Sequence, residues 1–306
     1  MARDFLSIDD LTPEELSQLL DLSAKVKATP DDYADRLRGK AIGMVFEKPS
    51  TRTRVSFEVA ISSAGGHPVP LSSAELQLGR GETIEDTGRV LSRYVDAIVL
   101  RTFEQERLEV LAGAATVPVI NALSDFEHPC QALADLLTVR ETKGGPAGRT
   151  LVYLGDGNNV THSLLLACAK AAMHIRAATP PGFEPIPQVV HRAREIAAAT
   201  GGSVQILSDP AEACRDADVL YTDVWASMGQ EDEAEARALV FPAYQLNERL
   251  VELAKDDVTV LHCLPAHRGQ EITDEVIDGP NSAVWEQAEN RLHTQKALLL
   301  WLLGLA

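Results

Sequence analysis

The sequence is poor in basic residues and has no long apolar run, and each shortage excludes a class of protein. Lysine and arginine number 28 against 45 aspartates and glutamates, so the formal net charge is −17. A field of that sign argues against a nucleic-acid or anionic-membrane partner. The longest apolar stretch, Ala297 to Leu303, is far shorter than the roughly 20 residues of a membrane-spanning helix. If this protein binds an anion, it must gather its few cations locally.

Cysteine is also scarce, and the four cysteines lie too far apart to indicate a disulfide framework or a zinc site. Cys130, Cys168, Cys214 and Cys263 include no CxxC pair, a pattern that favours reduced thiols in the cytoplasm. The first six residues contain no apolar segment of the kind found in signal peptides. We therefore expect a cytoplasmic protein.

What the chain does contain is an alternation of short apolar runs with longer helical patterns. Its 306 residues suffice for two domains. Strand–helix alternation predicts an α/β fold with parallel sheets flanked by helices. The predicted strands are 41–46, 97–101, 117–121, 150–155, 175–179, 204–208, 219–222 and 258–263. The main predicted helices are 13–27, 55–64, 82–94, 130–141, 161–174, 188–200 and 284–303. Thr12 and Glu15 match a capping box at the start of the first of these helices.

A turn-rich segment near the middle, Lys143 to Gly148, indicates the division between the domains. We predict a first domain over residues 1–133 and a second over 134–286, with a bridging helix that begins near His128. The C-terminal helix, 287–306, is expected to pack back on the first domain. In sheets of this kind, ligands bind beyond the carboxyl ends of the strands, and the polar motifs of this sequence follow predicted strands.

The first polar motif, Ser50-Thr-Arg-Thr-Arg54, lies between a predicted strand and a predicted helix. A helix N-terminus offers unpaired backbone N–H groups and a favourable dipole to an anion. Arg52 and Arg54 add planar, two-pronged donors that match phosphate. We interpret the motif as a phosphate-binding loop. The alternative is a capped helix whose arginines are solvated.

The second motif is His128-Pro-Cys-Gln131, at the start of a predicted helix. Pro129 suits the first helical turn and leaves His128 at the helix entrance. A neutral imidazole there can donate a hydrogen bond to a carbonyl oxygen on which charge builds. A histidine that only caps the helix is the alternative.

The third motif, Gly155-Asp-Gly-Asn-Asn159, follows another predicted strand. It does not complete the glycine pattern of dinucleotide-binding loops, because Val160 stands where the third glycine belongs. The amides of Asn158 and Asn159 are instead candidates for contact with a polar substrate. A purely structural turn is the alternative.

The fourth motif is divided between two strand ends, Asp223-Val-Trp-Ala-Ser-Met-Gly229 and His262-Cys-Leu-Pro265. Asp223 is suited to hold a substrate ammonium group. Cys263 is either part of the site or a small buried hydrophobe. The Leu264-Pro265 pair predicts an extended backbone whose carbonyl can accept from an NH₂ group.

Neither a metal nor a cofactor is predicted. His262 and His267 stand five positions apart across a proline, which is poor ligand geometry, and no paired carboxylates accompany them. Structural roles are expected for both histidines. The incomplete glycine pattern gives little support to a nucleotide cofactor.

Together these motifs resemble the aspartate/ornithine carbamoyltransferase family. Ser-Thr-Arg-Thr-Arg and His-Pro-x-Gln are shared across that family, whereas Asp-x-x-x-Ser-Met-Gly and His-Cys-Leu-Pro resemble its ornithine branch. The resemblance extends from residue 4 to Leu303, in the same order. It implies transfer of the carbamoyl group of carbamoyl phosphate to the side-chain amine of L-ornithine, which gives L-citrulline and phosphate in arginine biosynthesis.

The resemblance also implies roles for individual residues. Carbamoyl phosphate would be bound by Ser50, Thr51, Arg52, Thr53, Gln77, Arg101, His128, Gln131, Cys263, Leu264 and Arg291. Ornithine would be bound by Asn159, Asp223, Ser227 and Met228. The catalytic residues would be Arg101, His128, Cys263 and Asp223, and Cys263 with Asp223 as relay is a hypothetical acceptor for the proton of the amine. Gln77 would reach the ligand from the neighbouring subunit of a homotrimer, with active sites at the subunit interfaces.

Three other functions stay open on the sequence. The first is a transcarbamoylase for another acceptor: putrescine, N-acetylornithine or aspartate. Asp223 would repel aspartate, and putrescine would leave Asp223 and Asn159 without partners. The second is a non-catalytic protein on the same fold, which the loss of a phosphate-binding or carbonyl-polarising residue would favour; none is lost. The third, a nucleotide-binding oxidoreductase, has only the incomplete glycine pattern in its favour.

Overall fold

The computed structural model describes residues 3–72, 81–226 and 234–306. It divides into two compact units. Unit 1 contains Met1–Ala134 and Glu289–Ala306, and unit 2 contains Asp135–Ala288. The chain passes between the units within two helices, α5 (Pro129–Lys143) and α12 (Val284–Leu302).

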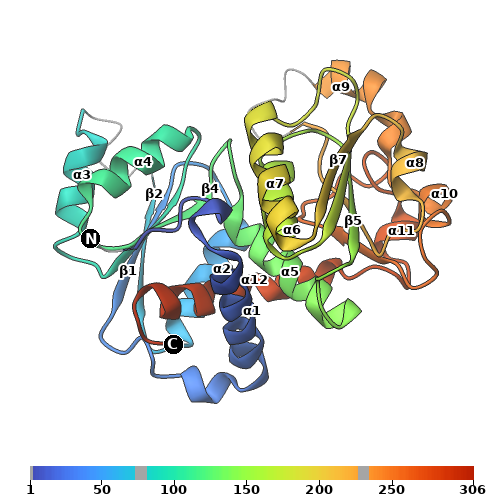
Figure 1. Ribbon diagram of the computed structural model, residues 1–306. Helices are drawn as coiled ribbons and strands as arrows, with labels where there is room; N and C mark the ends of the chain where they lie inside the picture. The colour runs from blue at the N-terminus through green and yellow to red at the C-terminus, as the bar shows by residue number, and fades with distance from the viewer. Residues whose placement is uncertain (1–2, 73–80, 227–233) are drawn as a thin grey trace. The chain divides into compact units, whose positions relative to one another are not determined.

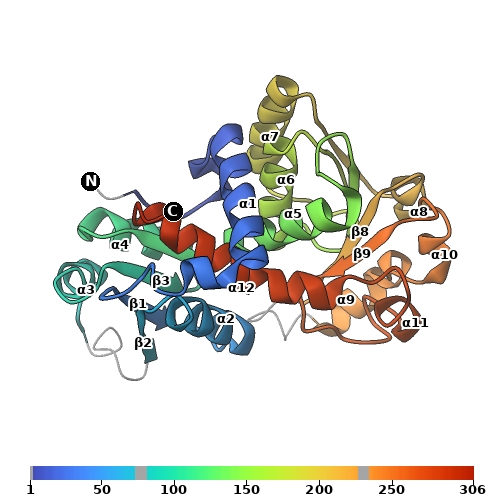
Figure 2. The same cartoon turned by 90° about the horizontal axis from the view of Figure 1, so that it is seen from below.

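Unit 1 is built on a parallel sheet with the strand order β2-β1-β3-β4. The strands are β1 (Ala41–Phe46), β2 (His67–Ser72), β3 (Ala97–Arg101) and β4 (Val119–Leu123). Because the chain turns from β1 to β2 in one direction and then returns past β1 to β3, right-handed crossovers place helices on both faces. Figures 1 and 2 show α3 (Ile84–Leu91) and α4 (Gln105–Ala114) together on one face, away from α2 (Thr51–Ser62). Val45, Ile98 and Leu111 belong to the core beneath α3 and α4.

Strand β2 is absent from the sequence-based prediction, because Pro68 and Pro70 argue against a strand. The structure shows how the prolines are accommodated. β2 is an edge strand, and the His67 amide donates at 2.8 Å to the carbonyl of Lys40, the residue before the neighbouring strand β1. Alternate residues of a strand donate to the same neighbour, so positions 68 and 70 face the open edge, where no N–H is needed.

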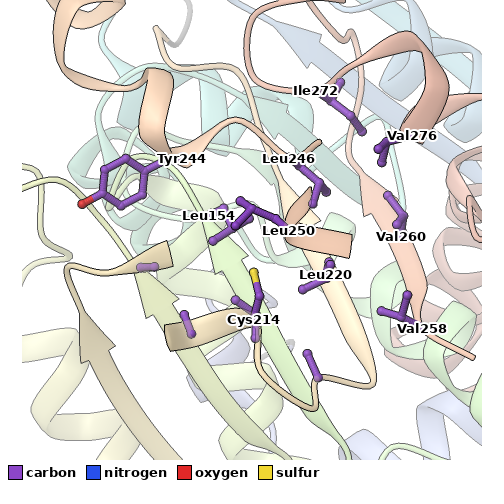
Figure 3. Close-up of a cluster of buried hydrophobic side chains, with 14 of the residues drawn as sticks. Leu154, Cys214, Leu220, Tyr244, Leu246, Leu250, Val258, Val260, Ile272 and Val276 are labelled. Atoms are coloured by element: carbon purple, nitrogen blue, oxygen red, sulfur yellow. The ribbon is translucent and has the colours of Figure 1, made fainter. Parts of the chain in front are cut away.

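Unit 2 is built on a five-stranded parallel sheet with the order β7-β6-β5-β8-β9. The strands are β5 (Thr150–Leu154), β6 (His174–Ala178), β7 (Ser203–Leu207), β8 (Val219–Thr222) and β9 (Thr259–His262). Figure 1 shows α6 (Asn159–Lys170) and α7 (Pro187–Thr200) on one face of this sheet. On the other face lies a buried apolar cluster, drawn in Figure 3, in which Leu154, Leu220 and Val260 of the sheet pack with Leu250 and Val276.

The remaining helices complete the two units. They are α1 (Pro13–Ala28) in unit 1 and α8 (Pro210–Cys214), α9 (Ala234–Val240), α10 (Glu248–Val251) and α11 (Asp274–Ile277) in unit 2. At the start of α1, Thr12 and Glu15 cap each other's backbone N–H groups, as the sequence predicts. Within the described residues, no helix combines the length and the apolar character needed to cross a membrane.

In each sheet the polar motifs lie at the carboxyl ends of the strands, where the strand order reverses. The order reverses between β1 and β3 in unit 1 and between β5 and β8 in unit 2. Open parallel sheets bind ligands outside the carboxyl ends of their strands at such a reversal. In unit 1 the Ser50 motif and Arg101 lie at these carboxyl ends, and in unit 2 the Gly155 motif and Asp223 lie there.

Candidate functional site

The Ser50 motif forms the capped start of α2. Ser50 is the N-cap, and its hydroxyl accepts a hydrogen bond from the Thr53 amide at 3.2 Å. The helix therefore begins four residues earlier than the predicted Val55. Thr53 is buried, whereas Arg52 is exposed and Arg54 pairs with Glu58 at 2.9 Å on the helix surface. The capped-helix alternative thus describes the local backbone, and it leaves Thr53 directed into unit 1.

Arg291 links the first and second motifs. It lies on α12 and is 4% exposed. Its guanidinium donates to the Gln131 side-chain oxygen at 2.7 Å and to the Thr53 hydroxyl at 3.1 Å. A planar fork with several donors suits this double contact. The contact brings together segments that are 160 and 238 positions apart from Arg291 in the sequence.

His128 is fixed by the turn between β4 and α5. The Glu127 carboxylate in this turn is fully buried and accepts from the Ser7 hydroxyl at 2.5 Å and the Ile8 amide at 3.1 Å. The His128 carbonyl in turn accepts the Gln131 amide at 3.0 Å. No role for Glu127 is predicted from the sequence, in which a carboxylate directly before the histidine is the one local signal.

The imidazole of His128 is kept neutral by its surroundings. Burial lowers its pKa well below 6.5, and the charges of Arg291, Arg101 and Arg52 lower it further. Arg101, the last residue of β3, is 7% exposed. An imidazole that stays unprotonated at pH 7 can donate one hydrogen bond without adding a charge. We call Thr53, Arg101, His128, Gln131 and Arg291 the arginine cluster.

Cys130, within the His-Pro-x-Gln motif, faces away from this chemistry. Its thiol donates to the Asn121 carbonyl at 3.3 Å, and burial raises its pKa to about 12. It behaves as a small buried hydrophobe with a weak donor. No role is predicted for this position from the sequence, and its contacts assign it none.

In unit 2, Asp223 is the centre of a second set of contacts. It follows β8, is 6% exposed and accepts from the Cys263 thiol at 2.9 Å. The Asn158 amide group donates to its other oxygen at 3.2 Å. Asn158 also caps α6, since its side-chain oxygen accepts from the amides of Val160 and Thr161. We call Asn158, Asp223 and Cys263 the carboxylate cluster.

Cys263 is held in its thiol form. Burial raises its pKa well above 9.0, and the negative charge of Asp223 and the hydrogen bond to it raise it further. A thiol that donates to a carboxylate has no thiolate lone pair with which to take a proton. This geometry opposes Cys263 as the base and leaves the Asp223 oxygens as the acceptors in the cluster.

The segment after Cys263 departs from the predicted extended backbone. Leu264 has a φ of 58°, in the left-handed region. Its amide donates to His262 Nδ1 at 2.8 Å, which closes a tight turn. The prediction failed because the rule for a residue before proline describes an average preference, and a buried side-chain acceptor overrides it here. Positive φ at a branched residue stores strain and is concentrated at functional sites.

Asp223, His262 and Cys263 each offer one possible metal ligand, and within the described residues these atoms lie within 4.8 Å of one another. This grouping is not predicted from the sequence, in which only His262 and His267 were considered as a pair of ligands. Both nitrogens of His262 are already engaged, one by the Leu264 amide and the other by the Glu271 carboxylate at 3.0 Å. The imidazole therefore serves the fold.

The remaining predicted site residues lie either at the starts of helices or outside the described residues. Ser50, Thr51 and Arg52 lie at the start of α2, and Asn159 is the first residue of α6 beside Asn158. Gln77, Ser227 and Met228 lie outside the described residues.

Two buried polar side chains of unit 2, Arg237 and Gln287, make contacts that were not predicted from the sequence. Arg237 of α9 pairs with Asp156 at 2.7 Å and donates to the Trp225 carbonyl at 2.8 Å. Gln287 donates to Asp135 at 2.7 Å and accepts from the His262 amide at 2.9 Å. Asp156 stands inside a recognised motif, but its partner has no local signal, because the pair forms across 81 positions.

Comparison with known proteins places this geometry. Residues 3–141 match the family description "Aspartate/ornithine carbamoyltransferase, carbamoyl-P binding domain" and residues 147–302 match "Aspartate/ornithine carbamoyltransferase, Asp/Orn binding domain". An ornithine carbamoyltransferase of Parafrankia sp. is 61% identical over 99% of this chain and 96% of its own length. The structure of the ornithine carbamoyltransferase from Pyrococcus furiosus superposes with a TM-score of 0.96 at 55% identity, covering 99% of this chain and 97% of that one. An anabolic ornithine carbamoyltransferase from Campylobacter jejuni gives a TM-score of 0.93 at 37% identity, with 98% of each chain covered.

Proposed function

The chain belongs to the aspartate/ornithine carbamoyltransferase family, and we propose that it transfers the carbamoyl group of carbamoyl phosphate to the side-chain amine of L-ornithine. The products are L-citrulline and phosphate. The observation that carries the proposal is the double contact of Arg291 with Thr53 and Gln131, which joins the phosphate motif to the His-Pro-Cys-Gln motif.

Carbamoyl phosphate is proposed to bind in unit 1. Ser50, Thr51, Arg52 and Thr53 would hold the phosphate with the N-terminus of α2, where backbone donors and the helix dipole favour an anion. Arg101, His128 and Thr53 would stabilise the carbamoyl oxygen as it gains negative charge. Gln131 and the Leu264 carbonyl would orient the carbamoyl NH₂ group, and Cys263 would lie near the reacting carbon. The neutral state of the imidazole supports its role as a donor.

Ornithine is proposed to bind in unit 2. Asp223 would hold the α-ammonium group, and Asn159, Ser227 and Met228 would contact the rest of the amino acid. The buried carboxylate with its two hydrogen-bond donors supports this assignment, since its position is fixed before the ligand binds. An N-acetylated acceptor lacks the α-ammonium charge that Asp223 would recognise.

The attacking amine must lose a proton before it can react. A pKa near 10.4, as for lysine, leaves about one molecule in a few thousand neutral at pH 7, which costs about 4.6 kcal/mol. Cationic neighbours and desolvation favour the neutral amine and reduce this cost. No covalent intermediate is needed, because phosphate is a good leaving group and positioning supplies much of the rate.

We propose that the protein works as a homotrimer in which Gln77 of one subunit reaches the carbamoyl phosphate of the next. Val55 and Val59 of α2 are 50% and 46% exposed, and their spacing places them on one face of the helix. Such an apolar pair supports a subunit contact. Sedimentation equilibrium tests it: a mass of one chain at micromolar concentration would contradict the trimer.

The reaction is proposed to run toward citrulline in arginine biosynthesis, in the cytoplasm. Two relatives support the direction, since the proteins from Pyrococcus furiosus and Campylobacter jejuni are described as anabolic. The four widely spaced cysteines, described as free thiols, are consistent with a reducing compartment.

The function is tested by product formation from carbamoyl phosphate with four acceptors in parallel: L-ornithine, putrescine, N-acetylornithine and L-aspartate. Strong selectivity for L-ornithine is expected. Preference for another acceptor would retain the carbamoyl phosphate assignment and overturn the roles of Asp223 and Asn159. Binding of carbamoyl phosphate without turnover of any acceptor would favour the non-catalytic alternative.

A further inference from the structure

Glu47 connects the chain that leaves β1 to the chain that leaves β3. It follows the last residue of β1 and stands three positions before Ser50. Its carboxylate accepts from the Thr102 hydroxyl and from two nitrogens of Arg107, of which Nε lies at 3.1 Å. We propose that Glu47, with Arg107, is a positioning residue that sets the phosphate-binding loop for carbamoyl phosphate. This inference rests on the proposed function and adds a residue pair to it.

The backbone beside Glu47 is locked to the same neighbouring strand. The Glu47 amide donates to the Arg101 carbonyl at 2.9 Å, and the Thr102 amide donates to the Leu123 carbonyl at 3.0 Å. Arg101, assigned to the carbamoyl phosphate, therefore lies between two fixed points. A shift of Glu47 would be transmitted to Arg101 through this hydrogen bond and to Ser50 through two intervening residues.

The next residue of the loop is anchored in a similar way. Lys48 is 6% exposed, and its ammonium nitrogen lies 4.0 Å from the centre of the Phe103 ring. A cation at this distance is attracted by the face of an aromatic ring. Two consecutive residues after β1 thus contact two consecutive residues after β3. The register of the two exits is fixed before α2 begins.

The pairing of Glu47 with Arg107 also settles the charge next to the loop. An unpaired carboxylate so close to a phosphate site would repel the ligand. Arg107, in the first turn of α4, contacts both carboxylate oxygens through one edge of its guanidinium, which is the strong two-pronged geometry. Arg107 lines a cavity of about 10 Å³ with Leu91 and Leu111, so methionine is chosen as an uncharged, apolar side chain of similar length.

The same two strands carry a comparable contact at their other ends, which provides a matched control. Asp96, directly before β3, accepts from the Lys40 ammonium group at 2.8 Å and from the Ala41 amide at 2.9 Å. Asp96 joins the starts of β1 and β3 through the Ala41 amide, whereas Glu47 joins their carboxyl ends through Thr102, where the phosphate motif lies. A general effect on sheet stability would appear in both pairs, and an effect on the ligand only in the Glu47 pair.

The experiment compares Glu47→Gln, Arg107→Met and their double variant with Asp96→Asn in the full chain. Calorimetry measures the dissociation constant for inorganic phosphate, and initial rates give KM for each substrate. For Arg107→Met we expect KM for carbamoyl phosphate to rise on the order of tenfold to a hundredfold, because a misplaced loop and an unpaired carboxylate both weaken binding. Glu47→Gln should have a smaller effect of about tenfold, because the charge left without its partner is the Arg107 cation, which does not repel an anionic ligand.

The double variant should bind no more weakly than Arg107→Met, since removing Glu47 also removes the repulsion. KM for ornithine should change by less than about twofold in every variant, and Asp96→Asn should leave both KM values within the same limit. The proposal is overturned if Glu47→Gln and Arg107→Met lower the melting temperature as Asp96→Asn does and leave KM for carbamoyl phosphate unchanged. If the wild-type chain binds neither phosphate nor carbamoyl phosphate, the proposed function fails first, and this assignment fails with it.

Discussion

His128 in unit 1 is buried and Cys263 in unit 2 is half-buried, and the neighbours of these two titratable groups carry opposite charges. Burial lowers the pKa of the imidazole and raises that of the thiol, because it disfavours the charged form of each. The arginines beside His128 and the carboxylate beside Cys263 act in the same direction as burial. Each cluster thus offers a fixed charge to a ligand and a neutral donor that does not compete with it.

The comparison also shows how the same strand-end position can serve opposite ligands. Unit 1 presents arginines where the strand order reverses, and unit 2 presents an aspartate at the equivalent reversal. An anionic ligand suits the first and a cationic ligand the second. Substitutions that change one cluster should therefore leave the ligand of the other unaffected, and the predictions test that separation.

The largest expected effect is that of Asp223→Asn. Loss of the buried charge should reduce kcat/KM for ornithine on the order of a thousandfold, because a buried charge contact contributes several kcal/mol. The dissociation constant for carbamoyl phosphate, measured by calorimetry, should change by less than about twofold. An equal loss of affinity for both ligands would show that the two clusters do not act separately.

Arg291→Lys should come next. It keeps the charge but lacks the planar fork that reaches Gln131 and Thr53 through two different nitrogens, so affinity for carbamoyl phosphate should fall about a hundredfold. Chemical denaturation should also show a lower free energy of unfolding, because buried acceptors lose a donor.

Arg38→Lys is the control for Arg291→Lys. Arg38 pairs with Asp35 on the surface of unit 1, where such pairs contribute little. Unchanged carbamoyl phosphate affinity in both variants would remove Arg291 from the binding role.

The neutral state of His128 predicts a pH dependence of stability. Because its folded pKa lies well below the ordinary 6.5, the unfolded chain binds one more proton below that pH. As the pH falls from 6.5, the free energy of unfolding of the wild-type protein should therefore decrease by about 1.4 kcal/mol per pH unit more than that of His128→Asn. Above pH 6.5 the two proteins should show the same slope. Urea titrations of both proteins between pH 5 and pH 8 measure this slope. Parallel pH profiles would show that His128 has an ordinary pKa in the folded chain.

Cys263→Ala should have the smallest effect on the rate. The shape of its pH–rate profile is more informative than the size of the change in rate. The thiol is neutral because its pKa lies well above 9.0, so its removal should not shift the limbs of the pH–rate profile. The rate should fall by about tenfold at most through the lost contact with Asp223. A shifted basic limb would restore Cys263 as the group that takes the proton.

Much of the fold follows from local patterns in the sequence. Ala41–Phe46, Ala97–Arg101 and Val219–Thr222 were predicted with the observed bounds, because each is an apolar run long enough for a buried strand and bounded by polar residues. The capped start of α1 was predicted from Thr12 and Glu15. β2 was missed, since the effect of its prolines depends on which strand edge they face.

The site could be predicted only where a motif is compact. The Ser50, His128, Gly155 and Asp223 motifs were found because each places several polar residues after a strand. Glu127 and Glu47 were not assigned roles, because single acidic residues are common on the surface of a chain with this charge. Leu264 shows the reverse case, in which a local rule was overridden by a buried acceptor.

The sequence by itself determined the parallel α/β class, most strands and helices, and which residues make up the four polar motifs. These features depend on periodicity and on residue types at short spacing. Tertiary structure alone decided that Arg291 meets Thr53 across 238 positions, that Cys263 donates to Asp223, and that His128 is neutral. Hydrogen bonds and pKa values depend on which distant groups remove water and supply charge. That information exists only once the chain has folded.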